Sequence, residues 1–422
     1  MTDPQRRDEV RWFVPGRIEV LGKHTDYAGG RSLLAAVDRG VTVHAVAAPA
    51  DEGSSGDESS QPEFIATTDA NPGEVRLVPG RESGLPGGHW GNYAQTVIDR
   101  LTANFGPLRP ARLTITSTLP LASGMSSSSA LLTGIALALV DLNGLTEHPA
   151  WQANITSRVD LAGYAACIEN GMSFGSLVGH RGVGTFGGSE DHTGMLCGVE
   201  GHLAQFSFCP IREEGQIAFP DDLSFVVAVS GVAAEKTGAA RDLFNRASLS
   251  TREIVARWNE ATGRSDAVIA DALGSGHEGA TRVEITERLR GLVADDTYLT
   301  KRLHQFVTES DEIIPAAAEA LAAGDLSRFG TLVDTSQRLT TTDLGNQVDE
   351  TIALARLARE LGAVAASAFG AGFGGSVWAL VPTADAERFA EQWLSVYRGE
   401  FPLAGVDAST LVTRPGAAAR PI

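Results

Sequence analysis

Two polar, glycine-flanked segments contain the residues whose types and spacing are best suited to chemistry. The first, PGRIEVLGKHTDYAGG (residues 15–30), reads as a strand that breaks at Gly22 into a run of ionisable side chains, Lys23, His24 and Asp26. A loop so rich in ionisable groups between apolar strands is typical of a binding site. Its lysine stands out, because the 422-residue chain has lysines only at positions 23, 236 and 301.

The second segment, PLASGMSSSSA (residues 120–130), has the composition of a phosphate site. Small residues lie between a predicted strand and an apolar predicted helix, so backbone N–H groups and four serine hydroxyls gather at a helix N-terminus. Such an end carries about half a positive charge and exposed donors, which suits a phosphate. The Walker pattern GxxxxGK[ST] is absent. A serine-rich helix cap is the alternative, although a cap needs one serine and not four.

A third segment, GAGFGG (residues 370–375), has the GxGxxG spacing of a dinucleotide loop. In a dinucleotide-binding fold that spacing follows a strand and opens a helix, but here the next residues, SVWALV, read as a second strand. A nicotinamide-dependent dehydrogenase is therefore disfavoured. We interpret the segment as a glycine turn that packs closely against another loop beside a triphosphate.

Composition and charge limit the class of protein. The formal net charge of −18 argues against a nucleic-acid or anionic membrane partner. The three cysteines form no CxxC pair and lie in apolar surroundings, which suggests reduced, buried thiols. With no signal-peptide or membrane-spanning pattern, we expect a cytoplasmic location. At 43% hydrophobic, the chain can bury more than one core.

The elements that must position these segments indicate two α+β lobes rather than a doubly wound sheet. Strands dominate the first half, around a flexible loop at residues 51–61. Helices are predicted at residues 89–106, in the apolar segment that follows the serines and ends at Gly144, from Trp151 to Asn170, and over most of 235–344. A strand, the third glycine segment and a second strand follow, with a last strand near residues 409–419. We divide the chain into an N-terminal domain (9–215) and a C-terminal domain (216–415).

The three segments, in this order, resemble the motifs of the GHMP kinase superfamily, and within it those of the galactokinases. WGNYAQTVI is also similar to a galactokinase helix. The resemblance covers nearly the whole chain. It implies a two-lobed GHMP kinase fold, α+β, with a β-rich N-terminal lobe that holds the nucleotide loop and a helix-rich C-terminal lobe. It also implies a sugar 1-kinase that uses ATP and Mg²⁺ and exists as a monomer or weak oligomer.

The resemblance implies roles for individual residues. Asp191, in GGSEDH, matches the catalytic aspartate, and Arg17 matches the arginine beside it. A carboxylate can accept or orient the proton of an attacking hydroxyl while a guanidinium keeps it ionised. Glu169 matches a carboxylate that helps to hold the metal, although the loop from Glu169 to Asp191 is longer than in typical galactokinases. The nucleotide loop matches the ATP-binding positions Ser123, Gly124, Met125, Ser126, Ser127, Ser128 and Ser129, of which Ser128, or the neighbouring Ser127, would bind Mg²⁺.

On the sugar side, Asp26 matches an aspartate that accepts hydrogen bonds from two ring hydroxyls, and His24 and Gly188 match further pocket positions. Two alternatives stay open, because Asp26 could instead cap the following turn and His24 could lie on the surface. The family's pocket tyrosine is replaced by Arg241 in an ungapped alignment, or by Phe244 if LFNR is paired with the family's tyrosine–asparagine element.

Lys23 raises doubt about which sugar is bound. Galactokinases have a glutamate at this position, which contacts the C6 hydroxyl of the sugar. Lys23 and Arg241 together would suit a carboxylate at that carbon, as in galacturonate. Alternatively, Lys23 pairs with an acid such as Glu190 and donates to a neutral hydroxyl, and the rest of the signature favours galactose or another neutral hexose. A catalytically silent sensor of sugar and ATP is a further alternative, which the retention of Arg17 and Asp191 disfavours.

Overall fold

The computed structural model describes residues 7–49, 63–120, 124–233 and 238–422, with the side chains of 238–241 excepted. The predicted loop at 51–61 and the predicted ATP-binding residue Ser123 lie outside the described residues. So does the side chain of Arg241.

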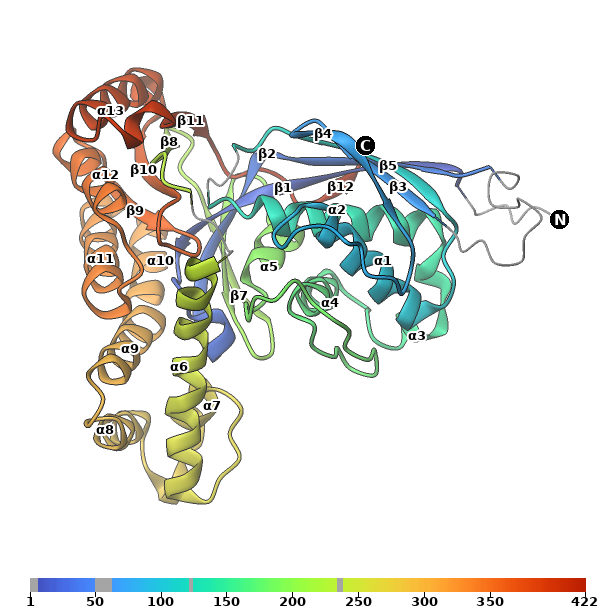
Figure 1. The fold of residues 1–422 in the computed structure, drawn as a ribbon. Coiled ribbons are helices and arrows are strands. Elements are labelled where there is room, and N and C mark those ends of the chain that lie inside the picture. Colours follow the sequence, from blue (N-terminus) through green and yellow to red (C-terminus); the bar gives the residue numbers. More distant parts are fainter. Residues whose placement is uncertain (1–6, 50–62, 121–123, 234–237) are drawn as a thin grey trace.

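The N-terminal lobe is built on one mixed sheet, whose described strands run in the order β12-β1-β2-β5-β3-β4, with β6 paired to β2 and β7 paired to β6 (Figure 1). Their bounds are β1 (Glu9–Leu21), β2 (Arg31–Ala47), β3 (Phe64–Thr68), β4 (Asn71–Leu77), β5 (Ala111–Ser117), β6 (His202–Ser207), β7 (Arg212–Ala218) and β12 (Arg420–Pro421). The alternation of buried Val41, Val43 and Ala45 with half-buried neighbours in β2 gives this sheet one face for packing.

Five helices cover that face in the described part of this lobe: α1 (Gly91–Phe105), α2 (Ser127–Leu142), α3 (Pro149–Gln152), α4 (Arg158–Asn170) and α5 (Glu190–Cys197) (Figure 1). Helix α2 is apolar on nearly all sides and lies buried at the centre. Its Gly134 allows close contact with the sheet, since a Cβ there would lie 2.8 Å from Val43 Cγ2. The single helix predicted from Trp151 to Asn170 is wrong, because Ser157 caps a new helix, α4, by accepting from the Asp160 N–H.

The C-terminal lobe combines a small sheet with most of the helices. Its antiparallel strands run β11-β8-β10-β9, with the bounds β8 (Leu223–Val229), β9 (Ala365–Phe369), β10 (Ser376–Pro382) and β11 (Ser409–Thr413). The helices are α6 (Gly238–Thr262), α7 (Ile269–Gly274), α8 (Arg282–Leu292), α9 (Thr297–Val307), α10 (Ile314–Ala322), α11 (Leu326–Leu339), α12 (Asp349–Glu360) and α13 (Ala386–Glu400). Buried residues of α12 and α13 pack on this sheet, and α6 to α9 extend away from it (Figure 1).

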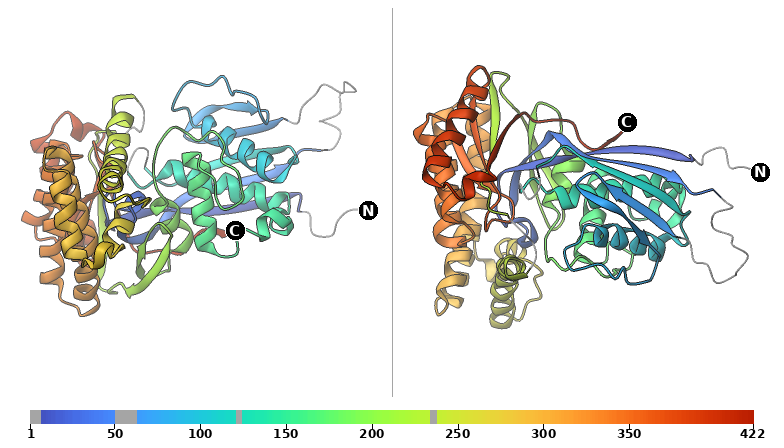
Figure 2. Two further views of the ribbon diagram at one scale, coloured as in Figure 1. Left: turned by 90° about the horizontal axis from the view of Figure 1, so that it is seen from below. Right: turned by 45° about the horizontal axis from the view of Figure 1, so that its top comes forward.

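The two-lobed α+β prediction is confirmed, with strands dominating the first lobe and helices the second. The chain passes from the first sheet to the second between Ala218 and Leu223, and residues 420–421 return to pair with β1 (Figure 2). The division into two domains near residue 215 stays a prediction. Among the described residues, no helix is both long and apolar enough to cross a membrane.

Candidate active site

A cavity of about 810 Å³ lies where β1, the N-termini of α2 and α5, and the loop between β9 and β10 converge. The structure brings most of the sequence-predicted site residues to its lining: Arg17, His24, Asp26, Gly124, Ser126, Ser127, Ser128, Glu169, Gly188 and Asp191. Phe244, one of the two candidates for the family's tyrosine position, also lines the cavity. Three predicted residues, Lys23, Met125 and Ser129, are not in the lining.

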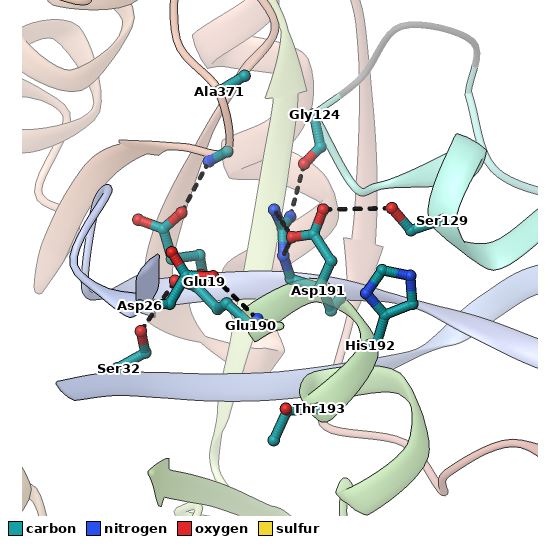
Figure 3. Close-up of polar contacts among 12 residues, drawn as sticks. Glu19, Asp26, Ser32, Gly124, Ser129, Glu190, Asp191, His192, Thr193 and Ala371 are labelled. Carbon is teal, nitrogen blue, oxygen red and sulfur yellow. Dashed lines mark hydrogen bonds and ion pairs between the residues drawn. The ribbon is translucent and has the colours of Figure 1, made fainter. Parts of the chain in front are cut away.

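Arg17 and Asp191 form the central ion pair of the cavity (Figure 3). Arg17 Nη2 lies 2.6 Å from Asp191 Oδ1, and Arg17 Nε donates to the same oxygen at 2.9 Å. Arg17 Nη1 donates to the carbonyl of Gly124 at 2.6 Å, which ties the pair to the nucleotide loop. Burial by itself lowers the pKa of Arg17, but the charges of Asp191, Glu190 and Glu19 outweigh it and raise that pKa, so the guanidinium stays charged.

The nucleotide loop turns into α2 through two left-handed residues, Gly124 (φ 70°) and Ser126 (φ 55°). These turns bring the hydroxyls of Ser127 and Ser128 and the first N–H groups of α2 to the cavity. The third glycine segment packs against this loop, because a Cβ on Gly370 would lie 2.8 Å from the carbonyl oxygen of Gly124. The loop-on-loop packing predicted for GAGFGG is therefore present.

Glu169 and the serines at the start of α2 supply hard oxygen donors of the kind that Mg²⁺ prefers. Ser129 Oγ donates to Glu169 Oε2 at 2.8 Å. It also lies 3.4 Å from Asp191 Oδ2, a contact that Figure 3 shows. Ser129 therefore links the two carboxylates from behind the lining. The described residues hold no cluster of three or more His, Cys, Asp or Glu side chains that could bind a metal by themselves. A metal here would need nucleotide phosphates as further ligands, and the donors present fit that arrangement.

Asp26 lies at the other end of the cavity, in a short 3-10 turn (Asp26–Ala28) after β1. Its Oδ1 accepts from the Tyr27 N–H at 2.8 Å and its Oδ2 from the Glu190 N–H at 3.0 Å. Asp26 therefore binds the backbone of its own turn and that of Glu190 at the start of α5, while the cap position of the turn belongs to Thr25. Its contact with a sugar stays a prediction. Burial raises the pKa of Asp26, whereas both backbone hydrogen bonds lower it. Gly188 packs on the carboxylate, where a Cβ would lie 2.3 Å from Asp26 Oδ2.

His24 is buried and braces two loops, so it is not a surface histidine. Its Nε2 lies 3.1 Å from the carbonyl of Ala371, and its Nδ1 lies 2.8 Å from the hydroxyl of Tyr27. A carbonyl can only accept, so Nε2 carries a proton and Nδ1 accepts from Tyr27 in the neutral ring. The backbone of His24 is left-handed at φ 59°, which turns the chain out of the strand.

Lys23 lies outside the cavity lining, contrary to the expectation that it contacts the sugar. It is almost fully buried, and Nζ donates to Ser336 Oγ at 3.5 Å. Ser336 in turn donates to Glu309 Oε1 at 2.9 Å. The charge of Lys23 also lowers the pKa of Glu19. A buried ammonium needs compensating charge, and the carboxyl groups that the structure connects with Lys23 are those of Glu19, through its charge, and Glu309, through Ser336.

Two buried glutamates that were not predicted as ligands line the cavity beside Asp26 (Figure 3). Glu19 Oε2 accepts from the Gly370 N–H at 3.2 Å, and Glu190 Oε2 accepts from Ser32 Oγ at 2.9 Å. Burial raises the pKa of Glu19 to about 7 and that of Glu190 well above its ordinary value, and the charge of Glu19 raises the pKa of Glu190 further. The signal for Glu19 was in the sequence, because Glu19 and Arg17 are two apart in a strand and share a face.

Comparison with known proteins agrees with this arrangement. Three family models match in order: the galactokinase galactose-binding signature (residues 4–47), the GHMP kinases N-terminal domain (92–179) and the GHMP kinases C-terminal model (317–399). The chain belongs to the GHMP kinase superfamily.

Relatives that match nearly the whole chain include several galactokinases. The galactokinase of Thermococcus kodakarensis is 24% identical over 393 residues, which cover 93% of this GHMP kinase and 95% of the relative. That of Chloroflexus aurantiacus is 28% identical over 389 residues, or 91% and 87% of the two chains. In structure, Lactococcus lactis galactokinase complexed with galactose superposes with a TM-score of 0.77 at 23% identity, covering 98% of this chain and 95% of that one.

The signature match has a simple structural meaning in this GHMP kinase. It ends with β2 and so includes the β1–β2 ribbon and the loop between the two strands, which carry Arg17, His24 and Asp26. The N-terminal domain match contains α2 and Glu169. Asp191 lies beyond that match, and its place beside Arg17 comes from the fold.

Proposed function

We propose that this GHMP kinase transfers the γ-phosphoryl group of MgATP to the anomeric hydroxyl of galactose or a closely related neutral hexose. The class of enzyme, an ATP-dependent sugar kinase, follows from its family and relatives. The proposal concerns the acceptor and the residues that act on it. The observation that supports it most strongly is the ion pair of buried Arg17 with half-buried Asp191, which faces a cavity between a helix N-terminus and Asp26.

In this mechanism, the N–H groups and serine hydroxyls at the start of α2 hold the phosphates of ATP. The anomeric oxygen forms a bond to the γ-phosphorus while the bond to the ADP oxygen breaks, and Asp191 accepts the hydroxyl proton. Arg17 orients the Asp191 carboxylate through their ion pair and stabilises the negative charge that develops. Ser128 or Ser127, with Glu169, would hold Mg²⁺, which supplies neutralisation of the phosphate charge.

The charge of the cavity supports a neutral acceptor over a uronic acid. Arg17 is the only lysine or arginine among the described lining residues, and Asp191 occupies it. The sugar end carries the carboxyl groups of Glu19, Asp26 and Glu190 instead. Among the described lining residues, no lysine or arginine other than Arg17 could receive a carboxylate on the acceptor, and Lys23 lies behind the lining.

The test is ATP-dependent phosphorylation across galactose, glucose, N-acetylgalactosamine, L-arabinose, galacturonate and glucuronate, with Asp191→Asn as the blank. We expect galactose to have the highest kcat/KM and Asp191→Asn to lower kcat by about 10³-fold or more while nucleotide affinity is kept. Lys23→Met should leave the order of sugars unchanged. A preference for galacturonate would refute the neutral acceptor, and sugar and ATP binding without turnover would favour the sensor alternative.

A further inference from the structure

Three fully buried polar side chains of the C-terminal lobe point at the loop that follows β1. Arg302 and Gln305 lie on α9, and Glu309 lies on the segment that continues it. Their spacing of three and four residues places them on one face of the helix. We call these three residues the loop clamp, and residues 22–27 the signature loop.

The side chains of the loop clamp bind the backbone of the signature loop at three consecutive residues. Glu309 Oε1 accepts from the Gly22 N–H at 2.9 Å. Gln305 Nε2 donates to the carbonyl of Lys23 at 3.1 Å, and Arg302 Nη2 donates to the carbonyl of His24. A buried loop must find partners for its N–H and C=O groups, and here three consecutive residues find them in the other lobe.

The loop clamp is also connected internally. Arg302 Nη1 donates to Gln305 Oε1, so the orientation of the Gln305 amide is fixed with its nitrogen towards the loop. The Arg302 guanidinium lies 5.9 Å from the centre of the Tyr27 ring, next to Asp26. Ser336 connects Glu309 to the ammonium of Lys23, which gives the buried carboxylate a nearby positive charge.

The helix changes geometry where it reaches the loop. Residues Thr308–Ile313 form a π-helical segment between α9 and α10, a rare geometry that is frequent at functional sites. Within it, Glu309 binds Gly22 at the start of the signature loop, and Ser310 Oγ accepts from the Arg31 N–H at 3.1 Å, just beyond its end. Two adjacent helical residues thus hold both ends of the turn that presents Asp26.

We propose that Arg302, Gln305 and Glu309 are positioning residues for the acceptor sugar, which fix the signature loop so that Asp26 faces the cavity. The inference rests on the proposed function. Among the described residues, the hydrogen bonds of the loop clamp reach neither the nucleotide loop nor Asp191, so its effect should fall on sugar binding. It also explains Lys23, whose carbonyl is bound by the loop clamp and whose ammonium balances Glu309.

The experiment compares Gln305→Leu with Gln95→Leu. Gln95 is also a buried glutamine whose Nε2 donates to a backbone carbonyl, that of Val78 at 3.0 Å, but it lies on α1 away from the signature loop. We expect Gln305→Leu to raise the KM for galactose about tenfold, with the KM for ATP within about twofold of wild type. Gln95→Leu should lower the thermal midpoint without changing the KM for galactose.

Gln305→Glu gives the same test if the leucine variant does not fold. Its carboxylate keeps the oxygen that accepts from Arg302 but cannot donate to Lys23, so the KM for galactose should again rise. The proposal would be overturned by an unchanged KM for galactose in a folded Gln305 variant. It would also be overturned if the KM for ATP rose as much as that for galactose and Gln95→Leu showed the same rise. Absence of turnover in the wild-type enzyme on every sugar would instead count against the proposed function.

Discussion

Replacement of Glu19 by glutamine should make the protein less sensitive to alkaline pH. Burial raises the pKa of Glu19 to about 7 from an ordinary value of 4.5, although Lys23 and Arg17 lower it. Between these two values, the folded protein keeps a proton that the unfolded chain has released. Stability from this group is therefore full below pH 4.5 and is lost as the pH rises through 7.

The magnitude follows from the width of that interval. One pH unit corresponds to about 1.4 kcal/mol for each proton bound differently, so the free energy of unfolding should fall by about 2–3 kcal/mol between pH 5 and pH 8 because of Glu19. Glutamine cannot ionise, and it still offers an oxygen to the Gly370 N–H. The charge of Glu19 also raises the pKa of Glu190. The substitution removes this charge, so it also reduces the loss of stability that Glu190 causes as the pH rises.

The assay is urea unfolding of wild type and Glu19→Gln at pH 5, 6, 7 and 8. Any effect of the substitution that does not depend on pH shifts the variant by a constant amount, so the change with pH is the quantity of interest. We expect the variant to gain about 2–3 kcal/mol relative to wild type between pH 5 and pH 8. Glu391→Gln, at an exposed position of α13, is the control. Parallel curves for wild type and Glu19→Gln would show that Glu19 is ionised throughout and would refute the reasoning.

Two further substitutions probe the two ends of the cavity. Gly188→Ala places a Cβ 2.3 Å from Asp26 Oδ2, whereas at Gly187 the nearest atom is Phe244 Cζ at 3.8 Å. Calorimetry should show that the affinity for galactose falls about tenfold or more in Gly188→Ala and changes little in Gly187→Ala. Equal affinities in the two variants would contradict the contact. Ser129→Ala removes the donor shared by Glu169 and Asp191. Steady-state kinetics should show a kcat about tenfold lower, with the KM values for sugar and ATP within about twofold of wild type. A change confined to KM would argue that Ser129 does not position the two carboxylates for catalysis.

The sequence was sufficient to predict the two lobes and most of the residues that line the cavity. Strand and helix periodicity located the core elements, and the three glycine-rich segments located the turns at which Arg17, Asp26 and the α2 serines approach one another. These features are local, so they can be recognised in short windows of sequence.

The orientation of Lys23 could not be predicted in this way. It depends on Glu309 and Ser336, which lie some 300 residues further along the chain. These two residues come close to Lys23 only when the two lobes have assembled. The same holds for Gln305 and Arg302, which look like ordinary polar residues of an amphipathic helix until the fold buries them against a loop. The break at residues 153–157 was missed because a serine cap inside a helical pattern is a weak local signal.

The return of residues 420–421 to β1 has a consequence for biosynthesis. β1 pairs with β2 on one side and, at Trp12 and Phe13, with β12 on the other. During translation that side of β1 stays without its partner until the whole C-terminal lobe has been made. A nascent chain therefore presents an unpaired strand edge, the kind of surface on which other chains add strands. A fragment that ends between the lobes would keep that edge permanently, so expression of the first lobe alone should favour self-association over an independent monomer.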